Sequence, residues 1–324
     1  MTPPNAAPPQ VAVSRPTVGA AFHMAPGEEL FRLAERLERA GYDALWVGDH
    51  MAVHGPVLEP FILLAALASR TQRIRLGTSV YVLPLRHPAV VAKLAASLDF
   101  LSNGRLILGV GVGGEFPKEF ELCGVPLRQR GRRAAEALAV LRALWRDGES
   151  SFHGEFAAFD GVTMLPKPLQ PGGVPLWGGG RSEAALRRAA RHCDGWLSYA
   201  MAPDRLAESL RRIQAYAEEA GRALDQFTVA HQVWLFVDGD EERAFRIANE
   251  NLSHRFAQPF AARTRKLSVL GPPEACREKL AAYHAAGVRH FIIDPVCPEA
   301  LADEQLERFA EELAPRLREF GAAA

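Results

Sequence analysis

The chain has 324 residues, no formal net charge at neutral pH and 48% hydrophobic residues, which is ordinary for a globular enzyme and allows one large α/β barrel or two smaller domains. This balance indicates no binding to nucleic acid or to an anionic membrane, and no apolar run approaches the roughly 18 residues of a membrane span. The four cysteines are far apart and include no CxxC pair, so we expect a cytoplasmic protein without disulfides or a metal site.

The first 16 residues are rich in proline and alanine and lack the basic and apolar regions of a signal peptide, so residues 1–16 are expected to form a disordered tail. From residue 17 onward, apolar runs of strand length alternate with helical patterns through short connections. Strands are expected at 17–22, 44–47, 74–82, 106–110, 174–177, 195–198, 227–237 and 290–294. Helices are expected at 28–40, 61–69, 88–101, 130–145, 182–192, 204–220, 240–253, 273–286 and 302–319.

Two stretches interrupt this alternation. Residues 151–166 contain short β-like pieces around Asp160-Gly161, which is typical of a hairpin turn. Residues 254–272 are irregular, and are either a flexible loop over a site or a long surface connection. Because no boundary is visible near the middle of the chain, a single (β/α)₈ barrel domain over 17–320 fits better than the alternative, a doubly wound sheet.

In such a barrel the active site lies at the carboxyl ends of the strands. Each of four consecutive strands is followed by a polar or glycine-rich segment. These segments are Gly48-Asp49-His50-Met51, Thr78-Ser79-Val80 with Arg86-His87-Pro88, Gly111 to Glu115 with Glu119 beyond, and Gly178-Gly179-Gly180-Arg181-Ser182. We therefore expect these four segments to meet at one face.

The last of these segments combines a strand, a glycine loop and the start of a helix. Glycines allow the backbone N–H groups to approach a ligand, and the first turn of a helix adds unpaired donors, so the segment suits a phosphate group. Ser182 can cap the helix and donate its hydroxyl to that phosphate. The alternative is a capped turn between strand and helix that binds no ligand.

His50 is the first candidate for proton chemistry, because imidazole titrates near neutral pH. Asp49 either orients His50 or binds a cofactor ring; alternatively it caps the next helix and His50 is half-exposed. Glu115 is either an acid in a glycine-rich loop or a solvated carboxylate, and His87 is expected to begin a helix. Five other histidines show no metal-ligand spacing and are interpreted as structural: His153, His192, His231, His284 and His290.

The run Gly41-Tyr-Asp-Ala-Leu-Trp-Val-Gly-Asp-His50 resembles the second-strand signature of bacterial luciferase-like flavin and deazaflavin oxidoreductases. Further matches follow in the order of that family, at 75–88, 101–111, 130–145, 175–196, 271–273 and 286–291. The resemblance covers about residues 17–320. It implies a (β/α)₈ barrel that binds coenzyme F420 or reduced FMN at its C-terminal face.

The resemblance also implies roles for the segments that follow the strands. A bulge after the third strand, Thr78-Ser79-Val80, would support the cofactor ring and often contains a non-prolyl cis peptide; Ser79-Val80 is at that position. Gly111 would lie near the cofactor, and Gly178, Gly179, Gly180 and Ser182 would bind its phosphate. Asp49 and His50 match positions near the ring and the substrate. Glu115 lies near the position of a ring-proximal glutamate, but the spacing has one extra residue, so Glu119 competes for that role.

Val47-Gly-Asp-His-Met51 resembles the deazaflavin branch, so F420-dependent hydride transfer to or from a small organic substrate is the leading expectation. The alternative is a monooxygenase that uses FMNH2 and O₂ and depends on a separate reductase. A third possibility is a non-catalytic luciferase-like subunit. A homo-oligomer is expected by analogy with the family, and residues 151–166 and 254–272 are expected to shape the substrate pocket.

Overall fold

The computed structural model describes residues 15–22, 27–53 and 55–320, so the predicted tail lies outside the described residues except for its last two positions. The described residues fall into two compact units. The N-terminal unit holds residues 22–38 and 43–197. The C-terminal unit holds 39–42, 198–324 and 1–21, as far as these are described. Every residue predicted for the site belongs to the N-terminal unit.

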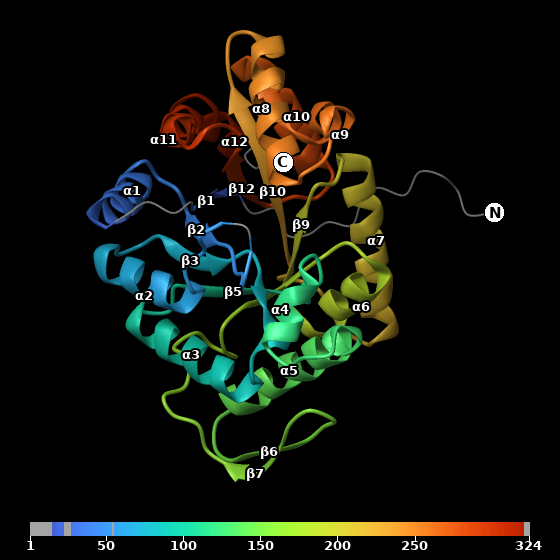
Figure 1. The fold of residues 1–324 in the computed structure, drawn as a ribbon. Helices are drawn as coiled ribbons and strands as arrows, with labels where there is room; N and C mark the ends of the chain where they lie inside the picture. Colours follow the sequence, from blue (N-terminus) through green and yellow to red (C-terminus); the bar gives the residue numbers. More distant parts are fainter. Residues whose placement is uncertain (1–14, 23–26, 54, 321–324) are drawn as a thin grey trace, which may run out of the picture. The chain divides into compact units, whose positions relative to one another are not determined.

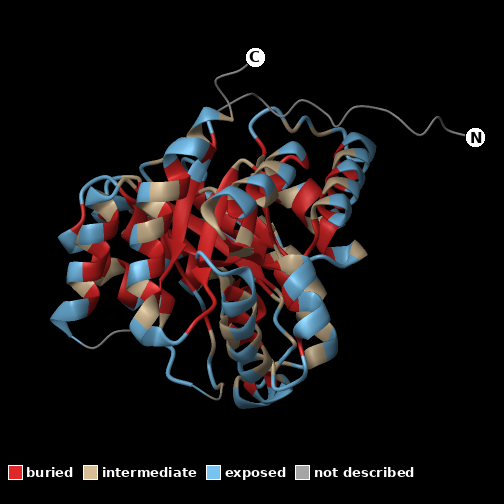
Figure 2. Cartoon of the chain, turned by 90° about the horizontal axis from the view of Figure 1, so that it is seen from above, coloured by how far each residue is buried: buried red, intermediate tan, exposed pale blue. Residues whose placement is uncertain are grey.

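The strands of the N-terminal unit form a parallel sheet in the order β2-β3-β5-β8-β9, with β4 paired to the end of β5 (Figure 1). Their residues are mostly buried (Figure 2), as apolar runs predict for parallel strands with both faces covered. Trp46 and Trp177 stack inside the unit with ring centroids 5.1 Å apart. The strands are β2 (Ala44–Val47), β3 (Arg75–Thr78), β4 (Tyr81–Val82), β5 (Leu106–Gly111), β8 (Leu176–Gly179) and β9 (Gly195–Tyr199).

Helices connect these strands and turn their apolar sides toward the sheet. Proline is in the first turn of α2, α3 and α4, where its missing N–H costs no helical hydrogen bond. His87 Nδ1 accepts a hydrogen bond from Ala89 N–H at 3.3 Å, so its predicted role at a helix start is confirmed. The helices are α1 (Glu28–Arg39), α2 (Pro60–Arg70), α3 (Pro88–Leu101), α4 (Pro117–Leu122), α5 (Arg130–Trp145) and α6 (Glu183–His192), with 3₁₀ turns at Leu83–Leu85 and Leu127–Gln129.

The predicted third strand, 74–82, is broken into β3 and β4 by a bulge. The Ser79-Val80 peptide is cis, as the family resemblance implied. β3 pairs with β2 and β5, whereas β4 pairs only with the end of β5. The short helix α4 was not predicted; it lies in the segment after β5 that was expected to be a loop.

The insert at 151–166 contains a hairpin, but its turn is not at Asp160-Gly161 as predicted. The antiparallel strands β6 (Ser150–His153) and β7 (Ala158–Val162) are joined at residues 154–157. The Glu136 carboxylate on α5 accepts hydrogen bonds from the N–H groups of residues 155, 156 and 157, which fixes the turn there. Gly161, with a φ of +60°, instead belongs to a bulge where the strand register shifts.

The strands of the C-terminal unit pair in parallel in the order β11-β10-β12-β1. Its strands are β1 (Thr17–Ala21), β10 (Thr228–Val237), β11 (Val269–Gly271) and β12 (His290–Pro295). Its helices are α7 (Pro203–Glu219), α8 (Glu241–Arg255), α9 (Ala261–Leu267), α10 (Pro273–Ala285), α11 (Glu299–Arg308) and α12 (Ala314–Glu319). A π-helical segment, Phe309–Leu313, joins the last two helices into one helical region over residues 299–319. This region begins three residues before the predicted start at residue 302.

The prediction that 254–272 is irregular is wrong for much of its length, because the segment includes α9 and β11. Phe260 is buried against Trp234 and Phe256, and Thr264 is fully buried, so these side chains anchor the segment to the C-terminal unit. Periodicity did not reveal a helix of seven residues and a strand of three because both are too short to show a repeat.

His231 on β10 is a buried histidine of the C-terminal unit. Its Nδ1 lies 2.8 Å from Ser198 Oγ, and its ring stacks on Tyr283 with centroids 4.5 Å apart. Burial lowers the pKa of His231 to about 3, against the opposing effect of the hydrogen bond from Ser198. The side chain is therefore neutral at physiological pH, which supports its structural interpretation.

Candidate active site

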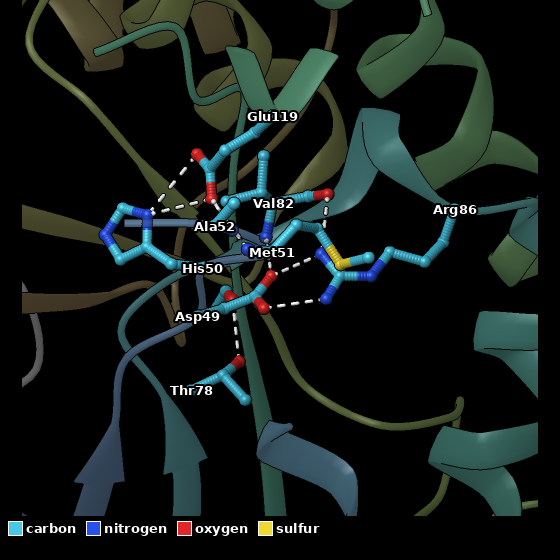
Figure 3. Close-up of polar contacts among 9 residues, drawn as sticks. Asp49, His50, Met51, Ala52, Thr78, Val82, Arg86 and Glu119 are labelled. Atoms are coloured by element: carbon cyan, nitrogen blue, oxygen red, sulfur yellow. Dashed lines mark hydrogen bonds and ion pairs between the residues drawn. The ribbon is translucent and has the colours of Figure 1, made fainter. Parts of the chain in front are cut away.

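Asp49 lies directly after β2, and its side chain is completely buried. Its Oδ2 accepts hydrogen bonds from Val82 N–H at 2.7 Å and from Arg86 Nη1 at 2.5 Å, and its Oδ1 accepts one from Arg86 Nη2 at 2.7 Å (Figure 3). Two parallel N–H···O bonds between a guanidinium and a carboxylate are the strongest form of such a pair. The predicted alternative, in which Asp49 caps the next helix, is wrong, because Glu59 caps α2.

His50 is held by a carboxylate from α4. Its Nδ1 lies 3.2 Å from Glu119 Oε1 and 3.4 Å from Oε2. Because a carboxylate accepts hydrogen bonds, Nδ1 is the donor, and Nε2 is the nitrogen left for a ligand. The ring of Phe116 meets the imidazole edge to face at 5.1 Å. One third of the His50 side chain is exposed, so this nitrogen is on an accessible ring of fixed orientation.

Glu119, and not Glu115, approaches His50. The Glu119 side chain is 2% exposed, and its Oε1 also accepts hydrogen bonds from Met51 N–H at 2.6 Å and Ala52 N–H at 3.2 Å. Glu115 is exposed. The short helix that begins at Pro117 explains the difference, because it turns Glu119 and Phe120 inward. The carboxylate therefore fixes both the imidazole and the backbone that follows it.

The side chain of Val80 occupies the space above two glycines of neighbouring strands. A Cβ on Gly111 would lie 2.4 Å from Val80 Cγ2, and a Cβ on Gly179 would lie 2.7 Å from Val80 Cγ1. Both contacts are far shorter than a carbon–carbon contact allows, so only glycine fits at these positions. Next to this group, Ser79 N–H donates to Val47 O at 2.8 Å, and Thr78 Oγ1 donates to Gly109 O at 2.7 Å.

The predicted glycine loop after the fifth strand begins later than expected, because Gly178 and Gly179 are the last residues of β8. A Cβ on Gly178 would lie 3.0 Å from Cys193 Sγ and 3.1 Å from Ala189 Cβ, so this glycine allows α6 to pack closely. Gly180 has a φ of +111°, which favours glycine. Ser182 is confirmed as the N-cap of α6, since its Oγ accepts a hydrogen bond from Ala185 N–H at 3.3 Å.

Sequence reasoning noted Arg86 only as part of a loop and missed its pairing with Asp49. An arginine in the apolar stretch between β4 and α3 was the available signal, because a charge in such a place needs a partner. No group of three His, Cys, Asp or Glu side chains among the described residues is arranged to hold a metal ion. None of the helices that these residues form has both the length and the apolar character that a membrane crossing requires.

Comparison with known proteins places the chain in a family. The model of the luciferase-like monooxygenase family matches residues 10–290. The chain is 29% identical to the F420-dependent glucose-6-phosphate dehydrogenase of Nakamurella multipartita, over 90% of this chain and 92% of the relative. It is 28% identical to the oxygenase component of the flavin-dependent trigonelline monooxygenase of Acinetobacter baylyi, over 90% of each.

Among solved structures, an F420-dependent secondary alcohol dehydrogenase in complex with an F420-acetone adduct is similar, with a TM-score of 0.82 and 21% identity. That alignment covers 94% of this chain and 99% of the other. The likeness shows that the fold is the predicted (β/α)₈ barrel and excludes the doubly wound sheet. With the family model matching most of its length, the chain belongs to the luciferase-like monooxygenase family and is an F420- or FMN-dependent oxidoreductase or monooxygenase.

Proposed function

We propose that this enzyme uses coenzyme F420 for hydride transfer to or from a small organic substrate, with His50 as the residue that moves the accompanying proton. The observation that carries the proposal is the hydrogen bond between His50 Nδ1 and the buried Glu119 carboxylate. It fixes one tautomer and leaves Nε2 without this partner, on a side chain that is one third exposed. The F420-dependent relative, 29% identical over 90% of the chain, supports F420, and the flavin-dependent relative, 28% identical over 90%, makes FMN the alternative.

The residues of the N-terminal unit fit a cofactor of this type. The N-terminus of α6 presents the positive end of a helix dipole, which suits a phosphate. The exposed Ser182 hydroxyl keeps its own proton for donation while it caps the helix. The bulge at Ser79-Val80 is fixed by β5 and β8 through the contacts of Val80, so it offers a rigid support for a ring.

The bound deazaflavin supplies a carbon centre that gives or accepts hydride, and the chain supplies the proton chemistry. When an alcohol is oxidised, hydride leaves the carbon and the hydroxyl proton must also leave. His50 Nε2 accepts that proton, and Glu119 stabilises the resulting imidazolium. In the reverse direction the imidazolium returns the proton to the carbonyl oxygen. We therefore infer that alcohols, aldehydes and activated double bonds are the substrates to test first.

A fluorescence titration with F420, and separately with FMN, tests the cofactor assignment. We expect micromolar affinity for F420 and weak binding of FMN. A preference for FMN would overturn the assignment in favour of a monooxygenase that needs O₂ and a separate reductase, the reaction type suggested by the trigonelline monooxygenase relative. Failure to bind either cofactor would favour a non-catalytic subunit.

The same titration tests the phosphate site through two matched variants. Asn and Asp cap helices as well as Ser does, so Ser182→Asn and Ser182→Asp both keep the start of α6 intact. Only aspartate adds a negative charge beside the proposed phosphate. We expect Ser182→Asp to weaken cofactor binding about tenfold or more, or about 1.4 kcal/mol, and Ser182→Asn to change it little. Equal affinities for the two variants would place the phosphate elsewhere.

We also propose that the protein is a homo-oligomer that associates through the outer face of α2 and α3. This face exposes Ile62, Val90, Leu94, Phe100 and Leu101, two of them by 71%. Helices that are apolar on both sides are typically buried. These two helices carry no exposed carboxylate. Their exposed cations are already engaged within the same unit: the Lys93 amine donates to Leu165 O, and Arg70 pairs with Glu28 and Glu35. A largely apolar face is matched best by an identical one, so we propose a second copy of the chain as its partner.

A pair of glutamate substitutions tests this surface. Val90→Glu with Leu101→Glu would bury charges in the proposed interface, so the mass measured by light scattering is expected to fall to that of one chain. The control is Leu122→Glu on α4, where the leucine is 66% exposed but is not on α2 or α3. A wild-type protein that is already monomeric, or an oligomer that survives the double substitution, would rule out this interface.

A further inference from the structure

Asp49 and Arg86 form the most completely buried ion pair of the candidate site, with side-chain exposures of 0% and 14%. We infer that this pair is a positioning device that fixes the His50 loop to the bulge after β3, and that Asp49 is not a ligand of the cofactor ring. Of the two roles that the sequence suggested for Asp49, this assignment favours orienting His50 over binding a cofactor ring. It rests on the proposed function only in that His50 and the bulge are taken to serve the cofactor and substrate.

The Asp49 carboxylate has little capacity left to accept a hydrogen bond from a ligand. Oδ2 accepts from both Val82 N–H and Arg86 Nη1, which occupies its two lone-pair directions, and Oδ1 accepts from Arg86 Nη2. Since the side chain has no exposed surface, a ring could reach it only by displacing one of these donors. In the view of Figure 3, Arg86 and the His50 ring lie on either side of Asp49.

The bonds of Asp49 join three segments of the chain: the loop after β2, the segment that follows the bulge and the segment before α3. Val82 follows the Ser79-Val80 bulge, and Arg86 lies just before α3. The Arg86 guanidinium also covers the ring of Tyr81 at 4.3 Å, and Tyr81 packs edge to face on Phe61 of α2 at 5.0 Å. One carboxylate therefore holds the loop after β2 against the bulge and against the start of the next two helices.

Glu119 completes the arrangement from the other direction. The hydrogen bonds of the Asp49 carboxylate anchor the chain directly before His50. Glu119 fixes the imidazole and the two N–H groups after it. The loop is thus bound by a carboxylate on each side of the histidine. Its orientation depends on both, but only the Glu119 carboxylate touches the imidazole, which leaves positioning as the role of Asp49.

A double-mutant cycle tests the inference with F420 as the probe. The variants are Asp49→Asn, Arg86→Met and the combination of both. If Asp49 acts through Arg86, each single variant should weaken F420 binding about five- to tenfold, and the combination should be no weaker than either. The NMR chemical shifts of the His50 ring should change alike in all three. Arg86→Lys keeps the charge but makes one bond instead of two, so it should restore part of the affinity.

The inference is overturned if Asp49→Asn weakens F420 binding equally in the wild-type and Arg86→Met backgrounds, because the two effects would then multiply and Asp49 would act on the ligand directly. It is also overturned if Arg86→Met leaves both F420 affinity and the His50 signals unchanged. Should the wild-type protein bind neither F420 nor FMN, the proposed function fails, but the His50 signals of the unliganded protein still test the pair. Arg86→Lys, compared with wild type, provides this test if Arg86→Met does not fold.

Discussion

Replacing His50 with alanine is expected to lower turnover about hundredfold while the protein remains folded and binds its cofactor. A positioned general acid or base contributes roughly 10²- to 10⁴-fold to a reaction, and the His50 imidazole is the proton carrier that we propose for this site. One third of the side chain is exposed, so its removal opens no large cavity. The measurement is the steady-state rate with the best alcohol or aldehyde found in a substrate screen, together with the thermal unfolding temperature.

The matched control is His153→Ala. His153 lies on β6, its side chain is 68% exposed, and it pairs with Asp160 at the surface, so its loss should change neither rate nor stability. Glu119→Gln separates charge from shape, because glutamine can still accept the N–H groups of Met51 and Ala52 but cannot stabilise an imidazolium. We expect it to reduce turnover less than His50→Ala does. Unchanged turnover in His50→Ala would remove the histidine from the mechanism.

Much of the fold could be predicted because it depends on local pattern. The strand at 44–47 and the helices at 88–101 and 130–145 have the predicted bounds, since apolar runs, an opening proline and helical periodicity are visible in the sequence itself. The segments that follow the strands could be named for a related reason. In a parallel barrel the order of the elements alone determines which loops share a face.

The errors arise where a distant residue decides the local structure. The hairpin turn predicted at Asp160-Gly161 lies instead at residues 154–157, because the Glu136 carboxylate on α5 accepts hydrogen bonds from the N–H groups there. No local sequence pattern indicates this contact. Gly179 was interpreted as a phosphate-binding residue, although its missing side chain already makes room for Val80. For that reason a Gly179→Asp substitution would disturb packing whether or not a phosphate binds nearby. Ser182 is therefore the better position for testing the proposed phosphate site.

The same principle explains the partial prediction of the site. His50 and Asp49 could be found because they directly follow a buried strand. The partners that orient them are 69 and 37 positions further along the chain, and only the folded backbone shows that Glu119 contacts His50 and that Arg86 pairs with Asp49. Sequence therefore pointed to the proposed catalytic side chain, His50, more readily than to the residues that hold it.

Gly109→Ala is expected to be the most damaging single-methyl substitution in the N-terminal unit. Gly109 lies on β5, and a Cβ at this position would be 1.9 Å from the carbonyl oxygen of Thr78 on β3. That oxygen belongs to backbone and cannot move away by rotation of a side chain. In addition, Thr78 Oγ1 donates to Gly109 O at 2.7 Å, so the two strands are held together where the methyl group would separate them.

We expect a loss of at least about 3 kcal/mol in the free energy of unfolding, since overpacking of a core against rigid atoms costs this much or more. For a chain of this size that corresponds to a fall in Tm of about 4 °C or more. Cofactor affinity should fall together with stability, because Thr78 immediately precedes the bulge at Ser79-Val80. Differential scanning calorimetry and the F420 titration measure the two effects.

Gly131→Ala is the matched control, because the same methyl group is added where it meets nothing. Gly131 lies in α5, and a Cβ added there would have no atom of another described residue within 4 Å, apart from its chain neighbours and the backbone of its own helix. Alanine in a helix is favoured over glycine by about 0.5–1 kcal/mol, so this variant should be slightly more stable than wild type. A Gly109→Ala protein as stable as Gly131→Ala would show that β3 and β5 are not as close at Thr78 as the structure has them. If Gly109→Ala instead loses stability but binds F420 normally, the bulge is not part of the cofactor site, and the proposed support of the ring must come from other residues.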